Sequence, residues 1–416
     1  MTGQDDVLVI GGGVIGVCSA YYLAGRGRRV TLIDRDEICS GASWGNAGFI
    51  CPSHSMPLAA PGVIGQALKW MFDPTSPFHI KLRFDRALSS WLMKFALACN
   101  QGRMQRSMAV LRDLGVASRA LYDELAAIDG LSFDMRREGL LHVYGTAEAY
   151  EDGAEEARLL TEHGIDAVVL DRQAVQQRLG DLECTGVGGV VCPGDAHLDP
   201  GQFVRGLAAL AEPMGVDVRT STEVLGWEVS GRAVTAVHTT RGDLHPRQIV
   251  LAAGAWSPSV ARDLRVRLPI EAAKGYSVTV ERPANAPALP MLLGETRVAV
   301  TPLADMLRFG GTLELAGMDL SVNQRRVDAI MQAARRFFPG LEESELIEIW
   351  RGLRPCSPDG LPFLGRPQAY DNLVVAAGHG TLGISLGPVT GKLVSQIVSD
   401  ETPMIDLTPL NVDRFG

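Results

Sequence analysis

Three glycines and one aspartate near the start of the chain have the types and spacing of a phosphate-binding loop. Gly11, Gly13 and Gly16 directly follow an apolar segment. That segment is Val7–Ile10, and Asp34 comes 18 residues after the last glycine. Such glycines let the backbone approach a pyrophosphate, and the helix that follows offers unpaired N–H groups at its positive dipole end. Because a carboxylate after the next strand accepts from ribose hydroxyls, the pattern predicts dinucleotide binding.

A second glycine-rich loop lies near the other end of the chain. The apolar segment Leu373–Ala376 runs into Gly378–Gly383, and a helical period of apolar residues follows. The N-terminus of that helix can stabilise the negative charge that a reduced flavin carries near its pyrimidine oxygen. Two such loops at the two ends of 416 residues are typical of a flavoprotein. For His379, cofactor contact and a hydrogen bond to loop backbone both stay open, and we assign it no proton transfer.

The segments between the two glycine loops supply further ligand contacts. Residues 40–48 are small and polar with no helical period, which suits close approach to the rings of a ligand. The predicted strand Ile249–Ala252 exits into another glycine turn suited to a cofactor edge. The residues that we assign to cofactor binding are Gly11, Gly13, Val14, Ile15, Gly16, Asp34, Arg35, Ser43, Asn46, Ala47, Gly48, Val224, Ala253, Gly254, Gly378, His379, Gly380, Thr381, Leu382 and Gly383.

Length and element order predict two domains. A chain of 416 residues exceeds what one hydrophobic core usually supports. Its opening order of strand, glycine turn, helix and strand is a βαβ unit. We therefore expect an α/β, Rossmann-like FAD-binding domain from residues 1–56, 196–265 and 350–416. An α+β substrate-binding domain with a mixed sheet then comprises residues 57–195 and 266–349.

Composition and charge disfavour several classes of function. The formal net charge of −9 argues against a nucleic-acid surface. The seven cysteines form no C-x-x-C pair, so they suit a reducing, cytoplasmic compartment and indicate neither a disulfide framework nor a metal site. Asp5 and Asp6 lead straight into an apolar strand, so we expect no signal peptide. No segment approaches the ~20 apolar residues that span a bilayer.

One aromatic and apolar stretch raises the question of a membrane surface. It contains Trp70, Phe72, Phe78, Trp91 and Phe95. No basic amphipathic face accompanies these residues, so we favour packing within the core. Peripheral contact with a quinone or with the inner face of the cytoplasmic membrane stays an alternative.

Five segments stand in a fixed order along the chain: Gly11–Gly16 with Asp34, Ser43–Gly48, Lys274–Ser277, Gly352–Pro362 and Gly378–Gly383. Together they resemble the D-amino-acid dehydrogenases, which belong to the FAD-dependent family that also contains D-amino-acid oxidase, glycine oxidase and sarcosine oxidase. The resemblance implies hydride transfer from the substrate's Cα to flavin N5. The imino acid is then hydrolysed to a keto acid and ammonia, or leaves as a cyclic imine if the substrate is a ring amine. No acid/base pair is required if the amine binds neutral.

The resemblance also implies a substrate site. Arg354 lines up with the arginine that binds the substrate carboxylate, which suits its planar fork of donors; a surface or interdomain ion pair is the alternative. Tyr276 either adds a hydroxyl or a wall to the site, or packs in the core. His54 either reaches the substrate or is a turn histidine beside Pro52 and Pro57. We assign Arg354 and Tyr276 to catalysis and, with His54, to substrate binding.

Two positions depart from the pattern of the family's oxidases. Members that attach the flavin covalently use a cysteine where this chain has Gly352, and Cys356 lies out of register, so we expect non-covalent FAD. Sarcosine oxidases carry a lysine in a strand that matches Leu313–Leu315. Glu314 in that place disfavours reaction with oxygen. We therefore expect electrons to pass to a quinone-type or other acceptor.

Two other functions stay open at this point. A glycine- or sarcosine-type amine oxidase would release peroxide, and a flavin-bearing subunit would work only in a hetero-oligomer. The sequence does not decide between D-alanine-like, D-proline-like and hydroxyproline-like substrates, because the pocket walls come from the insertion and not from the motifs. It also leaves homo- or hetero-oligomeric assembly open.

Overall fold

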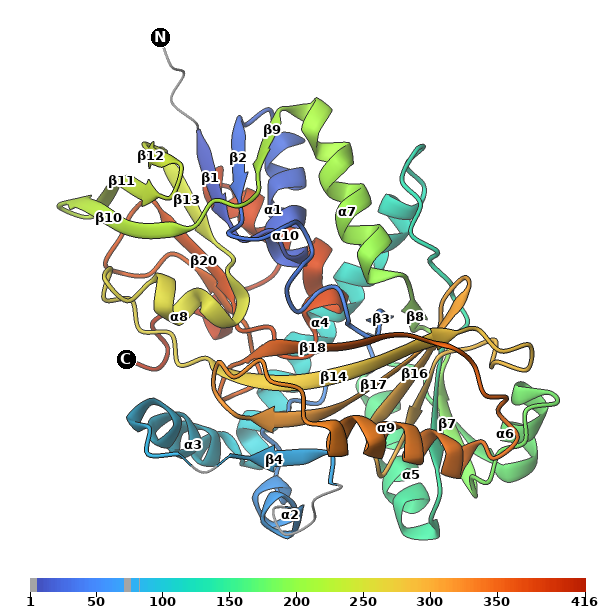
Figure 1. The fold of residues 1–416 in the computed structure, drawn as a ribbon. Helices are drawn as coiled ribbons and strands as arrows, with labels where there is room; N and C mark the ends of the chain where they lie inside the picture. The colour runs from blue at the N-terminus through green and yellow to red at the C-terminus, as the bar shows by residue number, and fades with distance from the viewer. Residues whose placement is uncertain (1–5, 71–75, 82) are drawn as a thin grey trace.

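Two large β-sheets, one above the other in Figure 1, organise the chain. The computed structural model describes residues 6–70, 76–81 and 83–416. The upper sheet has six strands in the order β19-β20-β13-β1-β2-β9, which are parallel except for β19 beside β20. This arrangement confirms the predicted Rossmann-like α/β fold. The strands are β1 (Val7–Ile10), β2 (Val30–Ile33), β9 (Val216–Arg219), β13 (Gln248–Leu251), β19 (Phe363–Gly365) and β20 (Leu373–Ala377).

Both faces of the six-stranded sheet are covered. Val7 and Val9 share a core with four helices, whereas Leu8 and Ile10 share one with a small antiparallel sheet, β10-β11-β12. Burial on both faces explains why these strands are continuous apolar runs instead of alternating ones. The covering elements are α1 (Val14–Ala24), α4 (Gln101–Ala126), α7 (Pro200–Ala211) and α10 (Gly383–Val398) on one face, and β10 (Val224–Ser230), β11 (Ala233–Thr239) and β12 (Gly242–Leu244) on the other.

The lower sheet has nine strands that pair both parallel and antiparallel. Its order is β18-β14-β17-β16-β15-β5-β7-β6, and β4 pairs with β17. The helix α9 (Gln324–Phe337) lies along one face (Figure 1) and packs on alternate residues of the strands. The strands are β4 (Phe78–Ile80), β5 (Leu140–Tyr144), β6 (Val168–Asp171), β7 (Gly188–Cys192), β14 (Glu271–Glu281), β15 (Met291–Leu293), β16 (Val298–Pro302), β17 (Met306–Leu315) and β18 (Leu346–Cys356).

Shorter elements complete the fold around the two sheets. The pair β3 and β8 lies between them, and α2 and α3 lie at the edge of the lower sheet (Figure 1). No helix in the described ranges is long and apolar enough to cross a membrane. These elements are β3 (Phe49–Ile50), β8 (Ala196–His197), α2 (Val63–Trp70), α3 (Arg86–Ala98), α5 (Ala147–Glu162), α6 (Arg172–Leu179) and α8 (Ser257–Val260).

Two parts of the expected domain division differ from the structure. β18 pairs with β14 along its length, so residues 350–356 belong to the nine-stranded sheet and the boundary falls after Cys356. The helix α4, which we expected in the second domain, shares the core of the six-stranded sheet through Leu114 and Tyr122. A helical period predicts the helix but not the partner of its apolar face, which tertiary packing decides. The rest of the division stays a proposal.

Among Trp70, Phe72, Phe78, Trp91 and Phe95, the side chains that the structure describes lie partly in the core and partly at a cavity. Trp91 is buried, stacks on Phe95 and donates its indole N–H to the carbonyl of Cys356 at 2.9 Å. Phe78 is half-buried and lines a cavity described below. The side chain of Trp70 and all of Phe72 lie outside the described part of the chain. Core packing therefore accounts for Trp91 and Phe95.

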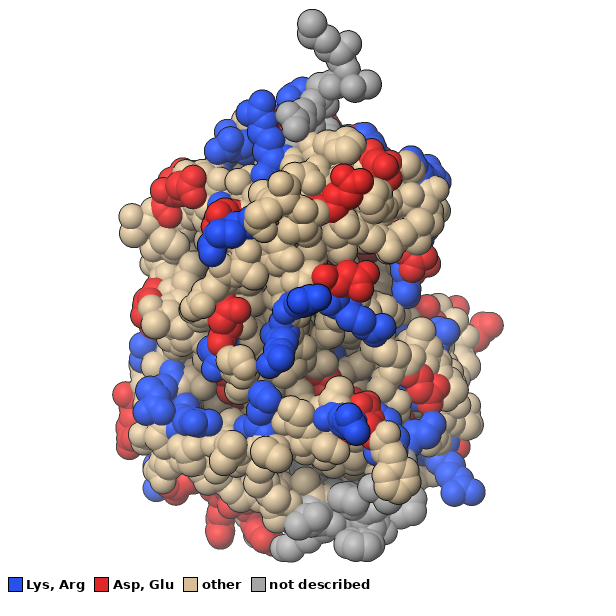
Figure 2. Space-filling model, turned by 90° about the vertical axis from the view of Figure 1, so that its left-hand side faces the viewer, with Lys and Arg blue, Asp and Glu red and all other residues tan. Residues whose placement is uncertain are grey.

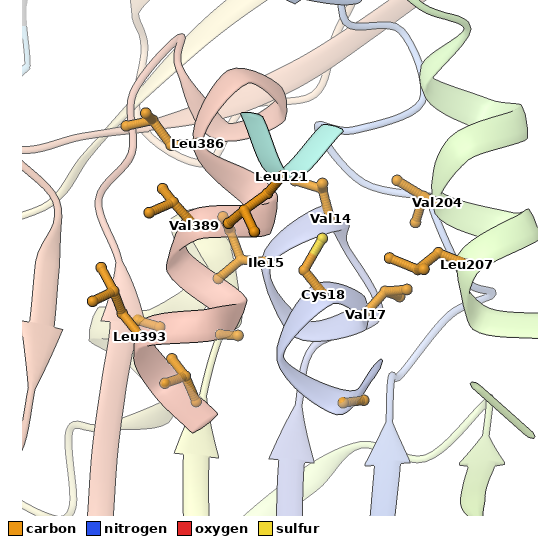
Figure 3. Packing of buried hydrophobic residues seen from close by; sticks show 14 of the residues in the cluster. Val14, Ile15, Val17, Cys18, Leu121, Val204, Leu207, Leu386, Val389 and Leu393 are labelled. Carbon is orange, nitrogen blue, oxygen red and sulfur yellow. The ribbon is translucent and has the colours of Figure 1, made fainter. Parts of the chain in front are cut away.

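Glycines bring α1 and α10 into close contact. A Cβ on Gly387 would lie 2.6 Å from Cγ2 of Val14, and one on Gly391 would lie 2.5 Å from the carbonyl carbon of Cys18. Figure 3 shows Cys18 on α1 facing α10, where Val389 points into the same core. The two helices that begin at the two glycine loops are thus held side by side.

Replacing Gly391 by alanine should push the two helices apart. The added Cβ meets backbone atoms of α1, which cannot move aside as a flexible side chain can, so we expect a loss of about 1–3 kcal/mol in the free energy of unfolding. Urea unfolding measures this change. Gly102→Ala in α4 is the control, because its Cβ meets no atom closer than 3.8 Å and alanine favours helix. Equal stability of both variants would contradict the role of this contact.

Candidate active site

A cavity of about 910 Å³ lies between the two sheets. Its volume is at the upper end of the range of about 300–1,000 Å³ for small-molecule sites. Figure 2 shows a face of the molecule that is hollowed between its upper and lower parts, with Lys and Arg side chains around the hollow. Residues from both glycine loops and from β17 and β18 form its wall. Every residue that we assigned to the cofactor lines the cavity except Gly16 and Gly48.

The three glycines of the first loop have different physical roles. Gly11 has φ = 118°, and a Cβ on it would collide with the backbone of Ala252. A Cβ on Gly16 would collide with the carbonyl oxygen of Gly11, so Gly16 is required for the turn itself. A Cβ on Gly13 meets only the Oγ of Ser43, at 3.4 Å, and otherwise points into the cavity. The absence of a side chain at Gly13 therefore leaves room for a ligand.

Asp34 is fixed by the backbone at the end of β2. Its carboxylate accepts from the N–H of Gly12 at 2.6 Å and from the N–H of Asp36 at 2.8 Å. Arg35 lies next to it with its guanidinium carbon 4.5 Å from the ring centre of Trp256. Asp34, Arg35 and Trp256 all line the cavity, and they form its polar and aromatic end beside the first glycine loop.

Two side chains of the nine-stranded sheet hold the loop at residues 40–48. Arg308 on β17 donates to the carbonyls of Trp44 and Asn46, each at 3.0 Å. Thr301 on β16 donates to the carbonyl of Ala47 at 2.8 Å. Sequence reasoning missed both residues, because no motif marks them and only the packing of the two sheets brings them to the loop.

The helix α10 begins at the cavity wall. No side chain caps it, and Gly383 and Ser385 in its first turn line the cavity. Since the first N–H groups of a helix have no partner within it, they present a positive dipole end to the cavity. His379 lies in the loop before the helix, with Nε2 3.0 Å from Oγ1 of Thr390. Burial lowers the pKa of His379 to about 3, so its imidazole is neutral at pH 7.

Arg354 reaches into the cavity from β18. Its Nη1 donates to the carbonyl of Thr312 at 2.7 Å, and among the described residues it forms no ion pair. Its guanidinium lies across Gly275, where any Cβ would overlap it. Burial lowers the pKa of Arg354 from its ordinary value. Arg354 is half-buried and has no carboxylate partner in the described residues, so an anionic group could bind to its guanidinium in the cavity.

A bulge in β17 shapes the wall beside Arg354. Thr312 and Leu313 both stand opposite Gly275, and Thr312 has φ = 66°. The bulge turns the carbonyl of Thr312 toward the guanidinium. It therefore sets the direction of Arg354, consistent with the use of bulges to re-aim side chains near active sites.

Tyr276 lies on the opposite face of the sheet from the cavity. It is buried in the core with α9, does not line the cavity, and donates its hydroxyl to Oε2 of Glu314 at 2.9 Å. Lys274 approaches the same carboxylate oxygen at 3.6 Å. Tyr276 is therefore a core tyrosine, which was the alternative to the expected role at the substrate site. Its side chain faces away from the cavity because successive side chains of a strand point to opposite faces of the sheet. Glu314 also faces away from the cavity, so it gives no direct argument about oxygen.

A second polar end of the cavity lies away from Arg354. His54 and His142 meet edge to face with ring centres 5.7 Å apart, and Glu156 and Arg297 line the same cavity. Burial lowers the pKa of His54 to about 4 and that of His142, beside His54, to about 3. His54 was expected from the sequence. The other three were missed, because they come from a strand, a helix and a turn that no motif connects.

Asp195 holds the segment that precedes His54. Its carboxylate accepts from the hydroxyl of Ser53 at 2.5 Å and from the N–H of Ser53 at 3.2 Å. Burial raises the pKa of Asp195 to about 7. The backbone N–H of Cys51, in the same segment, donates to the hydroxyl of Ser385 in α10 at 3.0 Å. These contacts fix His54 relative to the start of α10.

Cysteines and residues of metal-ligating types also line the cavity. Burial raises the pKa of the Cys356 thiol to about 12, so it is a neutral wall of the cavity. Within residues 6–70, 76–81 and 83–416, no group of His, Cys, Asp or Glu is arranged to hold a metal ion. All seven cysteines are free.

The sequence matches the family model described as FAD dependent oxidoreductase over residues 6–397. The chain belongs to this family. This FAD-dependent oxidoreductase is 36% identical, over 98% of both chains, to the D-amino acid dehydrogenase of Paramagnetospirillum magneticum. It is 34% identical, over 99% of both chains, to that of Granulibacter bethesdensis. The resemblance stated from the motifs is therefore confirmed.

Solved structures give the same fold. The glycine oxidase of Geobacillus kaustophilus superposes with a TM-score of 0.81, at 25% identity and with 99% of each chain covered. An L-proline dehydrogenase from P. horikoshii superposes with a TM-score of 0.77 at 18% identity, covering 100% of this chain and 98% of that one. Both solved structures thus share the fold of this chain.

The residues at the cavity fit the family's cofactor. The space left by Gly13 and the start of α1 suit a pyrophosphate, and the carboxylate of Asp34 lies where a ribose binds in such folds. The uncapped start of α10 suits the electron-rich edge of a flavin. The first glycine loop therefore suits the central pyrophosphate of FAD, and the second suits its flavin end.

Gly13→Val should remove flavin without unfolding the protein. The valine side chain would fill space that the protein leaves to the ligand, whereas only Ser43 lies near in the protein itself. We expect the purified variant to lack the yellow colour and to keep the urea unfolding midpoint of the wild-type protein freed of flavin. Gly16→Ala is the contrasting variant and should fail to fold, since its Cβ collides with backbone. Full flavin content in Gly13→Val would contradict the assignment.

Proposed function

We propose that this protein oxidises the Cα–N bond of an amino acid in D-configured or cyclic form, with FAD as cofactor and a quinone-type or other non-oxygen acceptor. The observation that carries this proposal is Arg354, a cavity-lining guanidinium whose only described partner is a backbone carbonyl. A carboxylate is the group that such a planar fork binds best. The two dehydrogenase relatives, named for D-amino acids, support the substrate class.

Each residue of the site has a separate task in this function. Bound FAD supplies the acceptor for the hydride that leaves the substrate's Cα. Arg354 binds the substrate carboxylate and so fixes the position of Cα. The histidines of the wall add no positive charge beside the substrate, because burial lowers the pKa values of His54 and His379 and keeps both imidazoles neutral at pH 7. A neutral amine needs no base, and the resulting imine is hydrolysed by water after release.

Three finer points belong to the same proposal. FAD is bound non-covalently, because Gly352 stands where covalent relatives carry a cysteine and Cys356 is a neutral, buried thiol. The choice of a non-oxygen acceptor rests on the dehydrogenase relatives, since Glu314 faces away from the cavity. A glycine- or sarcosine-type oxidase and a subunit of a hetero-oligomer are the rival functions.

Arg354→Ala and Arg354→Lys should both lose activity while retaining FAD. Loss of a charge-assisted pair in a shielded site costs about 2–5 kcal/mol, on the order of a thirty- to several-thousand-fold fall in kcat/KM. Lysine restores the charge but not the bidentate geometry. The measurement is kcat/KM with a dye acceptor in variants of checked flavin content. Near-wild-type values of kcat/KM would show that another residue binds the carboxylate.

Gly275→Ala is a second test of the same site. Its Cβ would displace the guanidinium of Arg354 without removing it, so we expect a fall in kcat/KM with most of the flavin retained. Gly194→Ala is the control, because Gly194 does not line the cavity and its Cβ would meet no atom within 4 Å. A larger loss in the control would contradict the placement.

Anaerobic reduction of the flavin tests the function itself. We expect D- or cyclic amino acids to bleach the yellow colour of the wild-type protein, and a dye or quinone to restore it faster than oxygen does. Peroxide formed in air at the rate of dye reduction would identify an oxidase instead. Flavin that no amino acid bleaches would favour the subunit of a hetero-oligomer.

A further inference from the structure

The second polar end of the cavity is built from four side chains of separate elements. His54 follows β3, His142 lies on β5, Glu156 lies on α5, and Arg297 ends the turn between β15 and β16. His142 faces the cavity because its neighbours on β5 face α9. We call these four residues the distal polar group.

The distal polar group is not satisfied by the protein. The Nε2 atoms of His54 and His142 are buried without a hydrogen-bond partner among the described residues. Glu156 is half-buried and Arg297 is exposed, and neither forms an ion pair within the same part of the chain. Burial raises the pKa of Glu156, and the positive charge of Arg297 opposes that rise. Buried polar atoms in native proteins are nearly always paired, so the two Nε2 atoms are placed for a ligand.

The distal polar group lies within reach of a substrate anchored on Arg354. The guanidinium of Arg354 lies between β14 and β17, since it covers Gly275 and donates to Thr312. Arg297 lies in the turn that joins β15 and β16, the next two strands of the sheet. The guanidinium of Arg354 and the turn that carries Arg297 are therefore two strand spacings apart, which is about 10 Å. An amino acid with a short polar side chain bridges such a distance.

We propose that the distal polar group is the subsite for the substrate's side chain and that it takes an uncharged side chain with both a donor and an acceptor, namely a hydroxyl or a carboxamide. This inference rests on the proposed function and names its substrate class. The imidazoles can each donate or accept, Glu156 accepts, and Arg297 donates.

The two charged members of the distal polar group have opposite sign, so an ionic side chain gains from one and is opposed by the other. A carboxylate at this end of the cavity would meet both Arg297 and Glu156, and so would an ammonium or guanidinium. Like charges brought close together disfavour binding. An apolar side chain would leave the two buried Nε2 atoms unpaired, which is also unfavourable. A neutral polar side chain avoids both costs.

The test compares kcat/KM for D-glutamine, D-glutamate, D-lysine and D-norleucine in the flavin-loaded enzyme with a dye acceptor. In the wild type, we expect D-glutamine to exceed the other three by about tenfold or more. Glu156→Gln should raise the ratio of D-glutamate to D-glutamine by about tenfold, and Arg297→Gln should raise that of D-lysine to D-glutamine similarly. His142→Phe keeps the ring contact and should lower the ratio of D-glutamine to D-norleucine.

Two matched variants control for changes of charge alone. Glu155→Gln and Arg158→Gln alter an exposed ion pair on the same helix as Glu156 and should leave every ratio unchanged. Ratios that stay constant in the Glu156 and Arg297 variants, or that fall equally for all substrates, would overturn the subsite while leaving amino-acid oxidation in place. A wild-type flavin that no amino acid reduces would overturn the proposed function and the subsite together.

Discussion

The close contact of α1 with α10 is the constraint on which the site depends. Two helices from opposite ends of the chain approach because Gly387 and Gly391 leave no side chain between them, and Tyr122 of α4 donates its hydroxyl to the carbonyl of Ile384 at the start of α10. Each helix begins at a glycine loop, so this contact sets the distance between the two positive helix ends. A cofactor long enough to reach both loops would lie along the carboxyl ends of the parallel strands, where ligands of such sheets bind.

The nine-stranded sheet sorts its side chains by alternation. Residues that face α9 build a core, and those that face the other way build the cavity wall. Tyr276 belongs to the first set and Arg354 reaches the second, although both come from motifs of one family. The bulge at Thr312 and the absence of a side chain at Gly275 allow the guanidinium to lie flat against the sheet. Backbone geometry therefore decides which motif residue can meet a substrate.

Much of the fold could be predicted from local patterns. The bounds of β1 agree with the prediction to the residue, because an apolar strand and the glycine turn after it are encoded within a few positions. The packing of α4 against α10 could not be predicted this way, since any apolar helix face can meet several partners. The same holds for Arg308, which holds the loop at Asn46 from a strand more than 250 positions away.

The candidate site shows the same difference between residues of contiguous motifs and residues that only packing brings together. Glycine loops and Arg354 carry their chemistry in contiguous motifs, so the sequence indicated them. The distal polar group depends on where a strand, a helix and a turn meet, so only His54 was indicated. The family resemblance also placed Glu314 at a functional position, whereas its carboxylate accepts a hydrogen bond from Tyr276 on the far face of the sheet.

The central claim is that Arg354 binds the carboxylate of the substrate inside the FAD cavity. A crystal structure of the flavin-loaded protein with propionate, which has the carboxylate but not the oxidisable amine, tests it most directly. The account predicts a bidentate contact between the carboxylate and the guanidinium of Arg354, with the contact of Arg354 to Thr312 retained. Propionate bound instead by Arg297 or Arg351, with Arg354 unoccupied, would contradict it.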